Sequence, residues 1–148
     1  EQEVISLLDR GFIYAVANVR GGAEMGQYWY DDGKMLKKKN TFYDFIDVTK
    51  FLIKEKYTAP KKVYAWGISA GGLLVGAVSN MRPDLYNGIY AQVPLVDALT
   101  TMLDSSIPLT IGEYDEWGNP EKQVFYDYNL VNDKNKMLNT GIEIKMDF

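Results

Sequence analysis

Residues 62–78 read KVYAWGISAGGLLVGAV: an apolar run, a Gly-Ile-Ser-Ala-Gly turn at 67–71, and a second apolar run. This order predicts a strand, a sharp turn and a helix, with Ser69 at the apex. Glycines on both sides of the serine suit a strained turn, because larger side chains there would collide with the strand or the helix. Such a turn raises the Ser69 hydroxyl above the sheet edge and directs the backbone N–H of Ala70 toward a developing oxyanion. The stretch therefore has the pattern of a nucleophile elbow.

The 148-residue chain contains no histidine. A serine hydroxyl is a weak nucleophile unless an adjacent base takes its proton. The sequence therefore predicts a chain that holds a nucleophile and lacks the base. From these residues alone, a structural serine in a glycine-rich strand-to-helix turn, as in a nucleotide-binding fold, stays open as an alternative.

The composition narrows the class of protein. With 47% hydrophobic and 14% aromatic residues, the chain can bury a core and is not of the disordered type. A net charge of −4 argues against nucleic acid as the main partner. The chain has no cysteine, which excludes a disulfide framework and thiolate catalysis, and we expect neither a metal site nor a cofactor. No apolar run approaches about 18 residues, so we expect no membrane partner.

The periodicity of apolar residues predicts alternating strands and helices. We expect strands at 12–19, 63–66 and 89–94, and helices at 1–10, from Thr41 to near Pro60, at 70–81, at 97–104 and near 121–130. This order is typical of an α/β fold with a parallel sheet and right-handed crossovers. Three strands make a poor sheet by themselves, because both outer strands expose unpaired backbone groups. Since the first residue is also Glu1 rather than Met, we expect the chain to be part of a longer protein.

The segments between these elements carry further predictions. Residues 20–40 read as a long polar loop, in which the lysines at 37–39 form a solvated basic run. Thr41 is expected to cap the helix that follows, with Asp44 favouring its positive end. The loop that follows 97–104 is rich in glycine, proline and acidic residues.

Several stretches in this order resemble the catalytic domain of the prolyl oligopeptidase family, and its oligopeptidase B branch in particular. They are RGGAEMG (20–26), WYDDGK (29–34), LKKKNTF (36–42), the elbow, NMRPDL (80–85), AQVP (91–94) and GEYDEWGNP (112–120). The resemblance runs from near residue 4 to about residue 128. It implies that residues 1–128 are part of an α/β-hydrolase peptidase domain. Residues 129–148 depart from the family pattern and are interpreted as a divergent or truncated tail.

The resemblance also implies roles for residues at the elbow. The family uses a Ser-Asp-His triad in that chain order, and Ser69 matches the nucleophile. Ala70 matches the residue whose N–H forms half of the oxyanion hole. The triad Asp and His lie downstream of the matching region, and the second oxyanion donor, a tyrosine, lies upstream. Ile68 stands where the family commonly has glycine, and because isoleucine disfavours positive φ we expect a local adjustment there.

The segment at 112–120 resembles the loop by which oligopeptidase B receives the basic side chain before the scissile bond. Glu113 matches the main acidic residue, and Asp115 falls where the family often carries a second glutamate. A guanidinium is well matched by a carboxylate in a partly desolvated pocket. Trp117 is the expected lining residue of that pocket. From residue chemistry alone, a solvated acidic loop is the alternative.

The expected function is that of a fragment of a serine-type endopeptidase, cytoplasmic and without a cofactor, which acts through an acyl-enzyme on Ser69. The resemblance implies short peptides as substrates, because the family places a β-propeller before the hydrolase domain, and cleavage after Arg or Lys, because of the acidic segment at 112–120. With the triad incomplete, the chain alone is expected to be inactive. The alternatives are an esterase of the α/β-hydrolase type and a non-catalytic pseudo-enzyme that binds peptides. The sequence predicts no particular oligomeric state.

Overall fold

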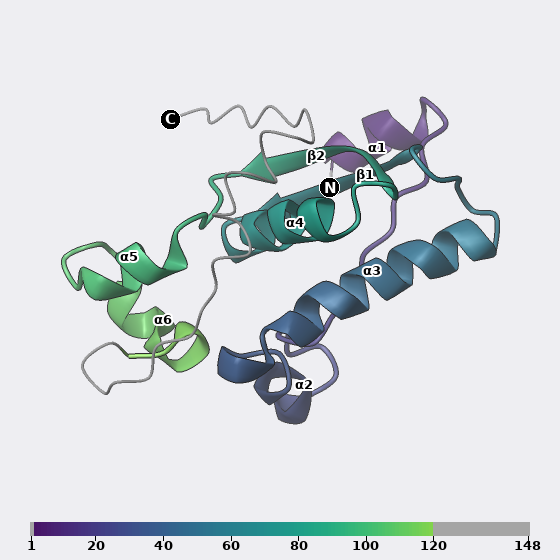
Figure 1. Cartoon of the computed structure of the whole chain (residues 1–148). Coiled ribbons are helices and arrows are strands. Elements are labelled where there is room, and N and C mark those ends of the chain that lie inside the picture. Colours follow the sequence, from purple (N-terminus) through teal and green to yellow (C-terminus); the bar gives the residue numbers. More distant parts are fainter. Residues whose placement is uncertain (1, 120–148) are drawn as a thin grey trace.

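The computed structural model describes residues 2–119. Along the chain the elements are α1 (Gln2–Leu8), α2 (Gln27–Asp31), the 3-10 helix η1 (Met35–Lys37), α3 (Lys39–Lys54), β1 (Val63–Ile68), α4 (Ala70–Met81), β2 (Tyr86–Gln92), α5 (Ala98–Leu103) and α6 (Thr110–Trp117). Figure 1 shows the two strands side by side, with α4 along the sheet and α5 and α6 together at one end.

The sheet is parallel, as the alternation of strands and helices predicts. β1 and β2 pair in parallel, with Ala65 opposite Ile89 and Gly67 opposite Ala91. The α4 helix connects them, contacts both, and packs against α3. Both strands differ from their predicted bounds: β1 runs on to Ile68, and β2 begins earlier and ends at Gln92. The extension of β1 places the end of the strand directly before Ser69.

The strand predicted at 12–19 is wrong for the part of the chain that the structure describes. These residues form no strand, and Phe12, Ile13 and Val16 are exposed. The described sheet therefore has two strands instead of three. An apolar run forms a buried strand only where neighbouring strands accept and donate its backbone hydrogen bonds. Here the amide of Val19 instead donates locally, to the carbonyl of Ala17 at 3.0 Å.

The helix predicted from Thr41 is confirmed, but it begins earlier and is not capped as expected. α3 starts at Lys39, so Thr41 lies in its first turn. The Thr41 hydroxyl donates to the carbonyl of Arg20 at 2.7 Å instead of accepting from the helix backbone. The expected polar loop before it contains two short helices, α2 and η1. Tertiary partners of Thr41 therefore override its local preference for the cap.

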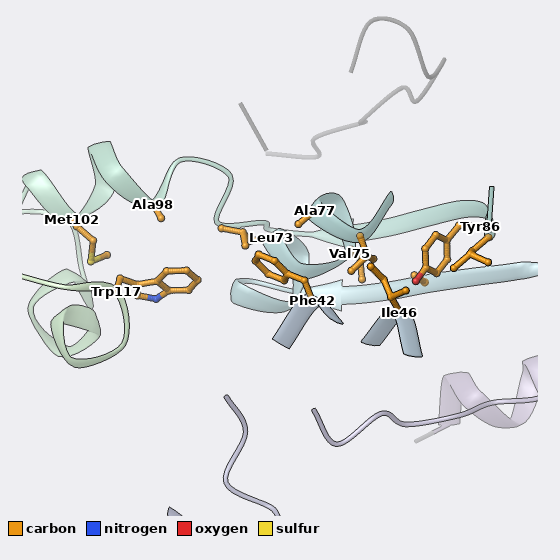
Figure 2. Packing of buried hydrophobic residues seen from close by; sticks show 12 residues of the cluster. Phe42, Ile46, Leu73, Val75, Ala77, Tyr86, Ala98, Met102 and Trp117 are labelled. Atoms are coloured by element: carbon orange, nitrogen blue, oxygen red, sulfur yellow. The ribbon is translucent and has the colours of Figure 1, made fainter. Parts of the chain in front are cut away.

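The core lies between α3, α4 and the sheet, and continues into α5 and α6. Figure 2 shows the buried side chains in a row. They are Phe42 and Ile46 of α3, Ala65 of β1, Leu73, Val75, Ala77 and Val78 of α4, Leu85, Tyr86 of β2, Ala98 and Met102 of α5, and Trp117 of α6. The predicted helix at 70–81 is confirmed as α4, which packs seven buried residues against its neighbours. Among residues 2–119, none of the helices is long and apolar enough to cross a membrane.

The C-terminal part of the described chain differs most from the sequence prediction. The short helix expected at 97–104 is confirmed as α5, and the Asp97 side chain caps it by accepting from the amide of Thr100 at 3.0 Å. The loop expected next is instead partly helical, because α6 spans Thr110–Trp117. Burial of Thr110 and Trp117 at its two ends accounts for this helix, since a short helix needs tertiary packing to form. The helix expected near 121–130 lies outside the described residues.

Candidate active site

Ser69 sits between the last residue of β1 and the first residue of α4, with φ 55° and ψ −116°. A positive φ in a residue other than glycine costs of order 1–3 kcal/mol and is found where the surroundings hold it in place. Here the amide of Ser69 donates to the carbonyl of Gln92 at 3.0 Å, and its carbonyl accepts from the amide of Leu95 at 3.0 Å. The strain falls on Ser69 itself, whereas Ile68 remains in the strand without a positive φ. The local adjustment expected at Ile68 is therefore not seen.

Two of the three glycines around Ser69 are required, because any side chain at their positions would collide with neighbouring atoms. A Cβ on Gly67 would lie 2.0 Å from the carbonyl oxygen of Gly71, and a Cβ on Gly72 would lie 2.6 Å from the Cβ of Pro94. Both distances are far inside van der Waals contact. A Cβ on Gly71 would meet nothing within 4 Å. The predicted crowding at the elbow thus applies to Gly67 and Gly72, and not to Gly71.

The arrangement leaves the two reactive groups of the elbow free. Ser69 is exposed and Ala70 is half-buried. Within residues 2–119, neither the Ser69 hydroxyl nor the Ala70 amide has a described hydrogen-bond partner. An unpaired first amide is normal for a helix, and it carries the partial positive charge of that end. An oxyanion formed at Ser69 could therefore accept a hydrogen bond from Ala70.

A second strained residue lies next to the elbow. Val93 follows β2 with φ 39°, although a β-branched side chain strongly disfavours that region. Its two neighbours in the chain, Gln92 and Pro94, are the residues that contact Ser69 and Gly72. Strained residues cluster at functional sites, where the surrounding structure over-determines them. No signal in the sequence pointed to this residue, because a residue before proline is expected to be extended, with a negative φ.

The acidic residues predicted to bind a basic side chain lie on α6. Trp117 Nε1 donates to Glu113 Oε2 at 3.0 Å, one helical turn away. Asp115 Oδ2 accepts from Lys34 Nζ at 2.8 Å and from the Tyr30 hydroxyl at 3.2 Å. The bond from Lys34 is the main cause that lowers the pKa of Asp115. Burial and the bond to Asp115 raise the pKa of Tyr30 to about 12.

Burial distinguishes two residues of this region. Trp117 is 2% exposed and belongs to the core, and its indole orients the Glu113 carboxylate. The lysine run is not solvated throughout, because Lys38 is buried. Its ammonium group pairs with Glu116 and lies 4.4 Å from the centre of the Trp117 ring. The structure thus groups Ser69 with Ala70, and Glu113 with Asp115 and Trp117; no described hydrogen bond joins the two groups.

Comparison with known proteins decides the family. The sequence profile of the prolyl oligopeptidase family matches residues 1–142. The chain belongs to the prolyl oligopeptidase family. Dipeptidyl aminopeptidase BI of Pseudoxanthomonas mexicana is 64% identical over 127 residues, which are 86% of this chain and 18% of that protein. Protease 2 of Moraxella lacunata is 57% identical over 124 residues, which are 84% of this chain and 18% of that protein.

Solved structures of the family have the same fold in this region. Oligopeptidase B from Leishmania major matches with a TM-score of 0.79 and 52% identity, over 87% of this chain and 18% of that one. Oligopeptidase B from Trypanosoma brucei with covalently bound antipain matches with a TM-score of 0.68 and 58% identity, over 74% of this chain and 16% of that one. The chain therefore spans about a fifth or less of the relatives it matches. The resemblance read from the sequence motifs, and the part of an α/β-hydrolase fold that it implies, are confirmed.

Arg20 of the prolyl oligopeptidase pattern RGG has a defined structural partner. Its guanidinium binds the Asp44 carboxylate in a two-pronged pair, with Nε to Oδ2 at 2.7 Å and Nη2 to Oδ1 at 2.5 Å. The Arg20 amide also donates to Asp44 Oδ2 at 3.0 Å. These bonds lower the pKa of Asp44. Asp44 thus fastens the segment before α2 to α3, a role different from the stabilisation of the helix end that its position predicts.

Among the described residues, no group of three or more His, Cys, Asp or Glu side chains could hold a metal ion.

Proposed function

We propose that this chain carries the nucleophile segment of a serine peptidase that hydrolyses short peptides after Arg or Lys. The observation that supports it most is the elbow: a strained, exposed Ser69 beside an unpaired Ala70 amide, in a member of the prolyl oligopeptidase family. Residues 1–128 then form part of the peptidase domain. Residues 129–148, which contain none of the family motifs named above, have no role in the proposal.

The proposed reaction begins with attack of the Ser69 hydroxyl oxygen on the scissile carbonyl carbon. A general base takes the hydroxyl proton, and the carbonyl oxygen becomes an oxyanion that accepts from the Ala70 amide. The C–N bond then breaks, the amine leaves with the proton, and the acyl group stays on Ser69 until water hydrolyses the ester. Because the 148 residues include no histidine, we propose that a residue outside this chain supplies the base.

The preference for basic residues is proposed from the acids of α6. Glu113 is a half-buried residue, and its carboxylate is oriented by a neutral donor, the Trp117 indole. A charge held in that way suits a guanidinium or ammonium group, because burial strengthens charge-assisted hydrogen bonds. Asp115 remains a candidate for a second contact, although Lys34 already occupies it. Trp117 acts in this proposal as a support for Glu113.

Two measurements test the proposed activity. The purified chain should show no hydrolysis of an arginyl chromogenic peptide, since it contains no imidazole base. A hybrid of Leishmania major oligopeptidase B, with its matching segment replaced by this one, should hydrolyse the same peptide. Ser69→Ala should then lower kcat/KM of the hybrid by about 10⁴-fold or more. Ser106→Ala, a change at an exposed serine between α5 and α6, is the matched control and should leave the rate unchanged. Equal rates for the hybrid and its Ser69→Ala variant would refute the proposal.

The lack of histidine also favours a second candidate, a pseudo-enzyme that binds peptides without cleaving them. The same hybrid separates the two. A hybrid that binds arginyl peptides but forms no acyl-enzyme, although the remaining triad residues are present, would favour the pseudo-enzyme.

A further inference from the structure

The three acids of α6 face different partners. Asp115 is paired with Lys34, and Glu116 is paired with Lys38. Within residues 2–119, Glu113 has no described cation as a partner, and the neutral indole of Trp117 donates a hydrogen bond to it. The two lysines come from the segment around η1, which contacts α6 at the same end of the molecule (Figure 1). Two of three negative charges are thus balanced by residues about 80 positions away in the sequence.

Lys34 is itself held in place. Its ammonium lies 3.2 Å from Asp31 Oδ1 and 4.8 Å from the centre of the Tyr30 ring. Its side chain is 21% exposed, whereas that of Asp115 is 66% exposed. The Tyr30 hydroxyl fills a second position on the same carboxylate oxygen of Asp115. Asp115 is therefore open to solvent and small molecules, but its Oδ2 is already bound on two sides and its charge is balanced by Lys34.

We propose that Lys34 is a specificity-determining residue that competes with the basic side chain of a substrate for Asp115, so that Glu113 alone selects the cation. This inference rests on the proposed function and says which residue sets the affinity of its binding site for a cation. Lys34 acts through Asp115, and so it is a positioning residue for recognition. Without Lys34, α6 would offer two carboxylates to the same guanidinium.

The size of the effect follows from competition. The apparent affinity for a ligand is reduced by the fraction of time that its site is available. If Lys34 occupies Asp115 for about nine-tenths of the time, its removal strengthens the contribution of Asp115 by about tenfold. The effect is specific for charge, because a neutral isostere of arginine gains nothing from a freed carboxylate.

The test uses the purified chain and a defined pair of probes. Carboxylate carbons of Glu113 and Asp115 are followed by NMR while Nα-acetyl-arginine methylamide is added, with the neutral citrulline analogue as the control. In the wild-type chain, Glu113 should respond to the arginine probe alone and Asp115 should not respond. In Lys34→Met, both carboxylates should respond and the affinity should rise by up to about tenfold. Lys37→Met removes a neighbouring lysine that pairs with Asp32, and it should behave as the wild type.

The pKa of Asp115, measured without ligand, tests whether Lys34 is the cause of the effect. Lys34 lowers the pKa of Asp115, so this pKa should rise in Lys34→Met and stay unchanged in Lys37→Met. Asp115→Asn is the second variant, and it should keep the full response of Glu113 to arginine. The proposal is overturned if Asp115 responds as strongly as Glu113 in the wild type, if Lys34→Met leaves the affinity unchanged, or if neither carboxylate responds.

These outcomes are separate from the failure of the proposed peptidase. Turnover that depends on Ser69 in the hybrid, combined with no effect of Lys34, would remove this inference and keep the peptidase. If Lys34 blocks Asp115 in the isolated chain but turnover of the hybrid does not depend on Ser69, this inference stands and the proposed peptidase is refuted.

Discussion

Replacement of Lys38 by methionine should destabilise the protein strongly. The Lys38 side chain is 6% exposed and pairs with Glu116, which is 20% exposed. Removing one partner of a buried ion pair costs about 3–5 kcal/mol, because the other charge is left without compensation. Glu116 keeps some contact with water, so we expect the lower end of that range, about 3 kcal/mol. With a typical urea m-value of about 1–3 kcal/mol/M, the unfolding midpoint should fall by about 1–3 M.

Urea unfolding of the purified chain, followed by circular dichroism, measures this change. The matched control is Lys37→Met, which removes the adjacent lysine from an exposed pair with Asp32 and should leave the midpoint within error. The double variant Lys38→Met with Glu116→Gln should recover much of the loss, because it removes the uncompensated charge. An unchanged midpoint in Lys38→Met, or a double variant no more stable than Lys38→Met, would refute the reasoning.

Three further predictions concern the rest of the molecule. The arginine bonded to Asp44 lowers its pKa, so this pair stabilises the fold above the ordinary carboxyl pKa and the stabilisation is lost as the pH falls through the lowered value. Urea unfolding from about pH 5 downward should show this loss in the wild type and not in Asp44→Asn; parallel curves would contradict it. Asp115→Asn should lower the pKa of Tyr30 from about 12 and leave it above the usual value, because burial is the larger cause. Ultraviolet titration against Tyr30→Phe measures this, and an unchanged value would contradict it. Gly67→Ala would place a Cβ 2.0 Å from a backbone oxygen of α4 and should cost about 3 kcal/mol or more, whereas Gly76→Ala, with nothing within 4 Å, should stabilise α4 by about 0.5–1 kcal/mol. Equal unfolding midpoints for the two variants would contradict the steric argument.

Several features of this protein were readable from the sequence because their causes are local. Part of the elbow depends on contacts between residues a few positions apart, such as Gly67 with Gly71, and the glycine pattern shows these directly. Its bonds to Gln92 and Leu95 and the contact of Gly72 with Pro94 join distant residues, and only the tertiary structure shows them. The helix at 70–81 follows from a continuous apolar stretch after that turn. Family membership was equally visible, since the motifs at 20–42 and 112–120 stand in the family's order.

Other features depended on partners far away in the chain, and only the tertiary structure decided them. The apolar stretch at 12–19 forms a strand only if another strand lies beside it, and otherwise it is an exposed segment. The spacing of apolar residues cannot indicate whether such a neighbour is present. Three adjacent lysines look alike in sequence, yet Lys38 is buried against Trp117 while Lys37 is exposed. The pairing of Lys34 with Asp115 joins residues 81 positions apart. The physical reason is that an ion pair depends on the distance between two charges in space, and only the packing of η1 against α6 sets that distance.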